Sequence, residues 1–189
     1  MKSRAWLTLA ILFLIAAPLA ISQESGPIQP AAAVVKPHAY VSLEPVPRGK
    51  SFEIAVVTEI RQGYHMNSNK PSEEYLIPTT LSVQPPVGFK LLDTSYPPGE
   101  MLKFSFSPTP LSVYSGRVKI LLRMQAGADA QLGAQTIPLT LRFQACNDTA
   151  CLPPVRVPVE VKLQIAAAGT SAHSANAEIF SSRKQTPKN

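Results

Sequence analysis

The sequence is constrained most by an alternation of apolar and polar residues with a period of two. From 155 to 163 every second residue is valine or leucine, and the residues between them are charged or proline. The stretches 137–143 and 52–56 alternate in a similar way. Successive side chains of a β-strand point to opposite faces, so each stretch predicts a strand with one face in the core and the other in water.

Shorter apolar stretches add further strand candidates, and proline or glycine separates them about every ten residues. They cover 39–43, 79–83, 89–92, 102–106 and 118–124. Pro138 and Pro158 stand on outward positions, which predicts a sheet edge or a bulge at each, where a missing backbone donor is tolerated. About seven or eight short strands without a long helix predict an all-β fold, an antiparallel immunoglobulin-like β-sandwich.

The chain of 189 residues is long enough for one such domain, which we expect at 38–165. Hydrophobic residues make up 45% of the chain. A core of roughly 130 residues buries well over half of its unfolded surface without covalent help. The two cysteines are therefore not needed to keep the fold stable.

Residues 1–22 have the composition of an export signal. Lys2 and Arg4 precede an apolar run from 6 to 20, and small residues stand at 20 and 22, the positions that a signal peptidase reads. The run is shorter than the roughly 20 residues of a spanning helix. We expect a cleaved signal, no stable membrane insertion and a periplasmic location in a bacterium; an uncleaved anchor is the alternative.

Both flanks of the predicted domain are expected to lack fixed structure. Residues 23–37 contain three prolines and a run of alanines, which is typical of a linker. Residues 166–189 are rich in alanine, serine and lysine and poor in large apolar residues, which is typical of a disordered tail.

The composition argues against several classes of function. The formal net charge is +6, but no basic run with interleaved aromatic residues accompanies it, so no nucleic-acid partner is expected. Two cysteines and three widely spaced histidines do not complete a zinc shell, so neither a metal nor another cofactor is expected. The Gly-x-Ser-x-Gly motif of serine hydrolases is absent from the sequence.

The two cysteines, Cys146 and Cys151, lie between the two best strand candidates. The residues between them are therefore predicted to join neighbouring strands of a hairpin, with the sulfur atoms close enough to bond. A bridge that closes so short a loop stabilises a fold by only about 2 kcal/mol, and an exposed one is open to attack by a thiolate. A reactive pair and a plain structural disulfide in a non-redox binding or scaffold module both remain open.

Several segments resemble the periplasmic N-terminal domain of the thiol:disulfide interchange protein DsbD. The most specific are Gln144-Ala145-Cys146, which closes one strand, and Cys151-Leu152-Pro153-Pro154, which opens the next. The segment 63–71, with its Gly-Tyr turn, and the segments 96–99 and 113–114 are similar to further features of that family. The resemblance spans about 39–163 of the chain.

The resemblance implies a relay of electrons. The reduced cysteine pair passes two electrons to an oxidised periplasmic thiol protein through a mixed disulfide, and a thioredoxin-like donor, expected here as a separate protein, reduces the pair again. By the same resemblance, Cys151 forms the mixed disulfide and Cys146 resolves it.

The chain departs from the family in two places. The aromatic pair that follows the glycine appears here as His65 and Asn67, and the acidic cap segment with its shielding phenylalanine is replaced by 104–108. Phe106 is the first candidate for the shield and Phe104 the second. His65 is a candidate to favour a thiolate, either by hydrogen bonding or as a cation; a histidine that only belongs to a turn is the alternative.

Three more residues are candidates for the cysteine pocket. Asp148, inside the loop, is placed to help proton transfer, although an aspartate in a tight turn more often binds backbone donors. Tyr64 and Tyr114 are candidates to line the pocket, with a place in the core or on a sheet face as the alternative for both.

Overall fold

The computed structural model describes residues 30–181. The predicted signal peptide, residues 1–22, lies outside this range, as do the last eight residues of the predicted tail, 182–189. No helix in the described range combines the length and the apolar character of a membrane span.

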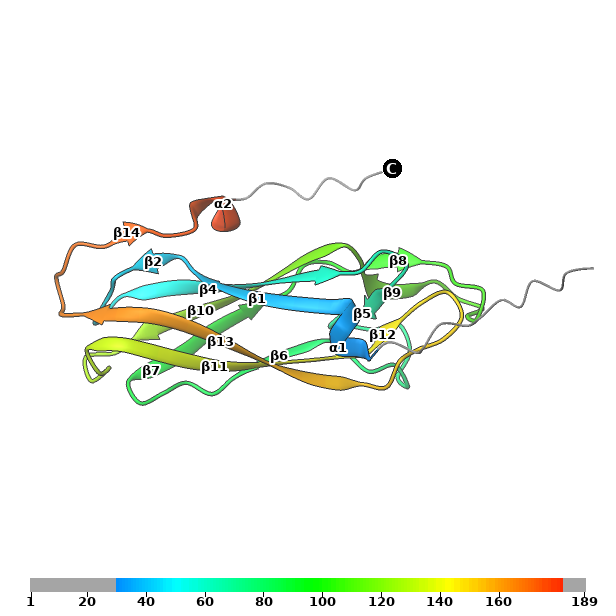
Figure 1. The fold of residues 1–189 in the computed structure, drawn as a ribbon, viewed down its shortest axis with the longest axis horizontal. Coiled ribbons are helices and arrows are strands. Elements are labelled where there is room, and N and C mark those ends of the chain that lie inside the picture. Colours follow the sequence, from blue (N-terminus) through cyan, green and yellow to red (C-terminus); the bar gives the residue numbers. More distant parts are fainter. Residues whose placement is uncertain (1–29, 182–189) are drawn as a thin grey trace, which may run out of the picture.

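Two four-stranded sheets form the body of the molecule (Figure 1). The first has the order β1-β4-β10-β7 and is antiparallel throughout, with β1 at Val35–Val41, β4 at Ser51–Ile60, β10 at Arg117–Ala126 and β7 at Phe89–Ser95. The second has the order β3-β13-β11-β6, with β3 at Val46–Pro47, β13 at Val155–Ala166, β11 at Gly133–Phe143 and β6 at Thr80–Val83. Only the short contact between β13 and β3 is parallel.

The remaining elements are small. A third sheet has the order β12-β5-β9-β8, with β12 at Ala145–Cys146, β5 at His65–Asn67, β9 at Leu111–Tyr114 and β8 at Glu100–Leu102. A fourth pairs β14, His173–Ser174, with β2, Leu43–Glu44. Two single-turn helices complete the described chain, α1 at Ala31–Val34 and α2 at Ala177–Phe180.

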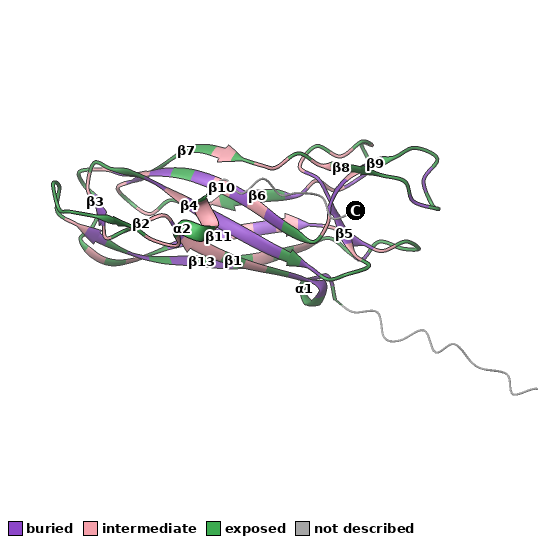
Figure 2. Cartoon of the chain, turned by 90° about the horizontal axis from the view of Figure 1, so that it is seen from above, coloured by how far each residue is buried: buried purple, intermediate pink, exposed green. Residues whose placement is uncertain are grey.

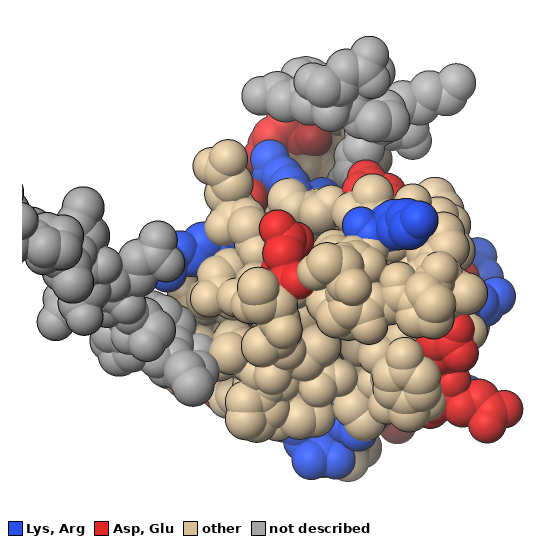
Figure 3. Space-filling model, turned by 90° about the vertical axis from the view of Figure 1, so that its right-hand side faces the viewer, with Lys and Arg blue, Asp and Glu red and all other residues tan. Residues whose placement is uncertain are grey.

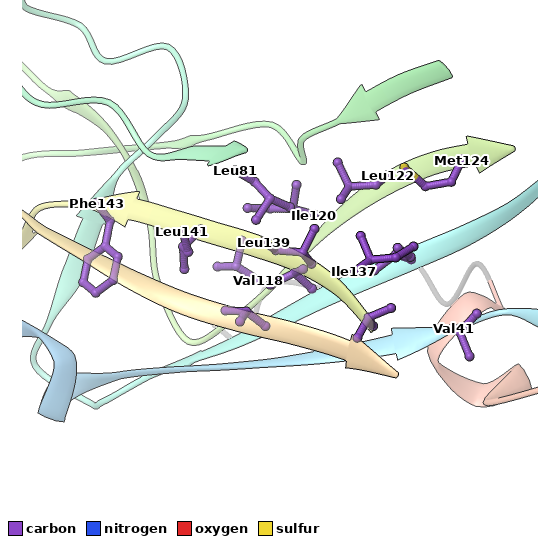
Figure 4. Close-up of a cluster of buried hydrophobic side chains, with 14 of the residues drawn as sticks. Val41, Leu81, Val118, Ile120, Leu122, Met124, Ile137, Leu139, Leu141 and Phe143 are labelled. Carbon is purple, nitrogen blue, oxygen red and sulfur yellow. The ribbon is translucent and has the colours of Figure 1, made fainter. Parts of the chain in front are cut away.

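The core lies between the two large sheets, and the period-two pattern accounts for it. Along β11 the side chains of Ile137, Leu139, Leu141 and Phe143 are almost completely buried, and those of β10 face them from the other sheet (Figure 4). Buried and exposed residues alternate along the long strands (Figure 2). Each large apolar side chain buried in this way stabilises the fold by about 1.5–3 kcal/mol relative to an exposed one. The predicted all-β, antiparallel, immunoglobulin-like sandwich is confirmed.

The two prolines within the long strands sit where a missing backbone donor costs little. Pro138 lies one residue beyond the ladder between β11 and β6, which starts at Leu139. Pro158 lies on a stretch of β13 that pairs with β11 alone, because β3 joins β13 only at its last two residues. Both are exposed, as the alternation predicted.

The structure corrects both predicted flanks. Residues 31–37 of the predicted linker form α1 and the start of β1, and the side chains of Ala31, Val34 and Val35 are buried in the main core. These apolar residues stay ordered because β1 pairs with β4 and carries them onto the sandwich.

The predicted disordered tail is likewise wrong for 166–181. After β13 the chain turns back over the first sheet, where β14 pairs with β2. The Asn176 side chain donates to the carbonyl of Val41, and the Lys119 amine donates to the carbonyl of Ile179. Backbone and side-chain hydrogen bonds, rather than apolar burial, hold this segment in place.

The predicted strand 102–106 is the other correction. The strand β8 ends at Leu102, and the chain then turns, with a hydrogen bond from the Ser107 amide to the Phe104 carbonyl. Phe104 is buried against the third sheet instead of extending a ladder. The strands β5, β9 and β12 were not predicted, because two to four residues are too few for a visible alternation.

Candidate functional site

The third sheet lies at one end of the sandwich and carries one of the two cysteines (Figure 1). Its edge strand β12 continues directly from β11 after Gln144. The neighbouring strand β5 follows the turn at Gly63, where a backbone φ of 82° favours glycine. The long strands of the core thus place the site at the end of the molecule.

Cys146 and Cys151 form a disulfide, with their Cα atoms 3.9 Å apart. Eleven residue pairs of β11 and β13 lead up to the loop between them, so the prediction of a hairpin closed near its turn is confirmed. The two cysteines differ in exposure: Cys146 is 1% exposed, whereas Cys151 is exposed to solvent. An incoming thiol or disulfide therefore has access to Cys151 before Cys146.

The loop between the cysteines is also fixed by hydrogen bonds of its own. The Asn147 side-chain oxygen accepts from the backbone amides of Thr149 and Ala150, at 3.0 and 2.8 Å, and from the Thr149 hydroxyl. Just outside the ring, the Leu152 amide donates to the Ala145 carbonyl at 2.8 Å. These contacts hold the loop in shape independently of the bond between the sulfur atoms.

His65 lies directly opposite Cys146 in the ladder between β5 and β12. Its side chain is buried and stacks on Phe104, with ring centroids 4.1 Å apart. Burial lowers the pKa of the imidazole below 6.5, and the negative charge of Asp148 opposes that shift. The structure therefore brings His65 and Asp148 together beside the cysteine pair.

Both candidate shielding residues lie at the site, in an aromatic segment that we define as 104–106. Phe104 is buried between His65 and the apolar cluster of Leu76, Leu111 and Val113. Phe106 stacks on the outer side of Phe104, with ring centroids 5.4 Å apart, and is 42% exposed. The Ser105 hydroxyl donates to the backbone carbonyl of Asp148, which ties the aromatic segment to the cysteine loop.

Asn67 is buried and joins three segments around the site. Its side-chain amide donates to the Ile77 carbonyl at 3.0 Å and to the Gln144 side-chain oxygen at 3.4 Å. The Gln144 amide in turn donates to the Leu152 carbonyl at 3.3 Å. Gln144 is a site residue that sequence reasoning missed; its place two residues before Cys146 was the available signal. The network spans both ends of the cysteine loop.

The two tyrosines take up different positions. Tyr114 is buried, and its hydroxyl donates to the Asn69 side chain at 2.6 Å and lies 3.0 Å from the Pro97 carbonyl. Burial raises the pKa of this hydroxyl above 10.0. Tyr64 is half-buried and packs against the main core. Tyr114 pairs with Met66, the residue after His65, so its side chain leaves the face of the third sheet opposite to His65 and Cys146.

The surface at this end of the molecule carries few charges. Seen end-on, most of it is uncharged, and acidic and basic residues lie scattered at the edges and in the upper part of the face (Figure 3). Within the described range, no group of three His, Cys, Asp or Glu side chains is arranged to hold a metal ion.

The family model for the thiol:disulfide interchange protein DsbD, N-terminal, matches residues 31–163, which include the whole site. The chain belongs to the DsbD N-terminal domain family. The predicted resemblance is thereby confirmed, and the match begins earlier than predicted, at the residues that form α1. None of the curated proteins compared with this chain matches it significantly.

Solved structures similar to this chain include two of the DsbD N-terminal domain from Neisseria meningitidis. The reduced form is 19% identical, with a TM-score of 0.44, and the match covers 78% of this chain and 94% of that one. A complex with the PilB N-terminal domain is also 19% identical, with a TM-score of 0.43, and covers 70% and 86%. The N-terminal periplasmic domain of ScsB from Proteus mirabilis is 11% identical, with a TM-score of 0.43, and covers 67% and 46%.

Proposed function

We propose that this chain is exported to the bacterial periplasm and relays electrons there through Cys146 and Cys151. The observation that carries the proposal is the disulfide between a buried cysteine, Cys146, and an exposed one, Cys151. It lies in a domain of the DsbD N-terminal family. That asymmetry suits a pair in which one thiol meets partners and the other completes the exchange.

The outward transfer runs in two displacement steps. The Cys151 thiolate attacks one sulfur of an oxidised periplasmic thiol protein, releases one partner thiolate and forms a mixed disulfide. The Cys146 thiolate then attacks the Cys151 sulfur, forms the intramolecular disulfide and releases the second partner thiolate. Two electrons pass to the partner, and its two thiolates take up the protons that the two cysteines lose.

The return transfer requires a thioredoxin-like donor. One thiolate of the donor attacks the exposed Cys151 sulfur and releases Cys146 as a thiolate. The second thiolate of the donor then displaces Cys151, so that the donor leaves with a disulfide and this domain holds two thiols. The relay needs no cofactor, because sulfur carries both electrons.

The aromatic segment 104–106 is proposed to shield the cysteine pair between partners. The stacking of Phe104 on His65 and the hydrogen bond from Ser105 to the cysteine loop support this role. The exposed ring of Phe106 is the part that a docking partner meets first. We assign Asn67 to positioning of the loop, and Tyr64 and Tyr114 to support of the pocket wall.

Trapping and potential measurements test the relay. We expect Cys146→Ser to accumulate mixed disulfides with periplasmic thiol proteins and the matched Cys151→Ser variant to accumulate far fewer. The reduction potential of the wild-type pair is expected above about −300 mV, the level below which structural disulfides lie. A lower potential together with no trapped partner would identify a structural disulfide in a non-redox module and refute the relay.

A further inference from the structure

The imidazole of His65 is a buried polar group that the exchange steps above leave without a role. Its Nε2 atom is buried and has no hydrogen-bond partner among the described residues. Leaving a buried polar atom unpaired costs about 1–3 kcal/mol. Thr58 Oγ1 is the other such atom in the described chain, but it lies on β4 between β1 and β10, within the sandwich. Only His65 combines an unpaired atom with a place beside the cysteines.

The strand register brings the imidazole close to the buried cysteine. His65 and Cys146 face each other across β5 and β12, so their side chains leave the same face of the sheet. Directly opposite residues of an antiparallel pair have Cβ atoms roughly 4.5–5.5 Å apart, which is within reach of an imidazole and a thiol. A disulfide offers the imidazole no proton, whereas a reduced Cys146 has an S–H donor.

We propose that His65 is the base that accepts the proton of Cys146 when Cys146 resolves the mixed disulfide, a role that rests on the proposed relay. The Cys146 thiol gives its proton to His65 Nε2, and the sulfur electron pair forms the bond to Cys151. The bond between Cys151 and the partner sulfur breaks, and the partner leaves as a thiolate. The imidazolium then returns its proton to that thiolate or to water.

Burial explains why this step needs a base. Cys146 is 1% exposed, and its removal from water disfavours the thiolate that must attack. Cys151 is exposed, so water can solvate the charge of its thiolate. The two displacement steps therefore place different demands on the protein, and His65 serves the second.

The electrostatics of the site suit a base that is neutral at rest. Burial lowers the imidazole pKa, so Nε2 is free to accept a proton at neutral pH. Asp148 is the charged group in the described chain that acts on the imidazole, and its carboxylate stabilises the imidazolium that forms. Phe104 stacks on the ring without charge, and Tyr114 on β9 directs its hydroxyl to Asn69 and Pro97 instead.

The two displacement steps can be timed separately with a small aromatic disulfide, dithiobis(nitrobenzoic acid). Attack by Cys151 of the reduced protein releases a first coloured thiol, and resolution by Cys146 releases a second. In His65→Phe, which keeps a flat ring against Phe104, we expect the first phase to change by less than about twofold and the second to slow by at least about tenfold at neutral pH. His65→Gln, which cannot take up a proton, should slow the second phase equally.

His38→Phe is the matched control, because His38 is exposed on β1 and should leave both phases unchanged. A second phase at the wild-type rate in His65→Phe, or a rate restored by His65→Gln, would overturn the assignment, as would slowing of the first phase alone. Failure of the wild-type protein to release the second thiol would instead count against the relay itself.

The wild-type pH profile decides the question even if the variants do not fold. With a neutral imidazole as base, the second phase should change little between about pH 7 and 8. Without a base, its rate should follow the thiolate fraction and rise about tenfold per pH unit. The steep profile would refute the role of His65.

Discussion

Removal of the disulfide should leave the domain folded, and the size of the effect follows from the loop that it closes. The bridge joins residues five apart in sequence, so the ring contains six residues. On the loop-entropy relation, a ring of that size stabilises the native state by about 2 kcal/mol. A domain of this kind is stable by about 5–15 kcal/mol in total, so most of its stability should survive reduction.

The surroundings of the ring support the same expectation. The ladder between β11 and β13 and the hydrogen bond from Leu152 to Ala145 already bring the two ends of the loop together. The three hydrogen bonds accepted by the Asn147 side chain keep the turn in shape without the sulfur bond. Reduction should therefore change the loop locally and spare the two large sheets.

Urea unfolding of the oxidised protein, the reduced protein and the double variant Cys146→Ser, Cys151→Ser measures this effect. We expect a loss of about 2 kcal/mol in both reduced and variant proteins, an unchanged m-value and a fall in Tm of about 4–8 °C. A loss of more than about 4 kcal/mol in the free energy of unfolding, or unfolding on reduction at 25 °C, would show that the disulfide is essential to the fold and refute the reasoning.

Three further predictions concern the core, the wall behind the site and pH. Leu141→Ala should cost about 2–5 kcal/mol in urea unfolding because Leu141 is fully buried, whereas the exposed Leu132→Ala should stay within about 0.5 kcal/mol. Tyr114→Phe leaves the Asn69 side chain without its hydroxyl donor and should lower the free energy of unfolding by about 1–3 kcal/mol. The reduction potential of the cysteine pair should stay unchanged in this variant. Because burial lowers the His65 pKa, the unfolded chain binds a proton at this side chain more readily than the native protein does. The contribution of His65 to the free energy of unfolding should therefore be constant above about pH 6.5 and should fall as the pH drops below that value. Urea unfolding at a series of pH values measures this dependence, and His65→Phe should lack it.

Most of the fold could be predicted from local patterns. Alternation of apolar and polar residues predicted the strands β4, β11 and β13, and an apolar stretch predicted β10. The hairpin at the cysteines follows from two alternating strands on either side of a short loop. The flanks were mispredicted because their structure leaves no pattern in the local sequence. The single turn α1 has too few residues to show a helical period. The segment after β13 is held by hydrogen bonds to residues far away in the sequence, which no local pattern can predict.

The sequence by itself determined the sandwich, the position of the cysteine pair and the family, because each of these depends on the order of neighbouring residues. Only the tertiary structure decided which side chains surround the sulfur atoms. His65, Phe104 and Cys146 are far apart in the chain, and the short strands β5 and β12 bring them together. The unequal exposure of the two cysteines was also decided there, because burial depends on the packing of the whole end of the sandwich rather than on the residues next to each sulfur.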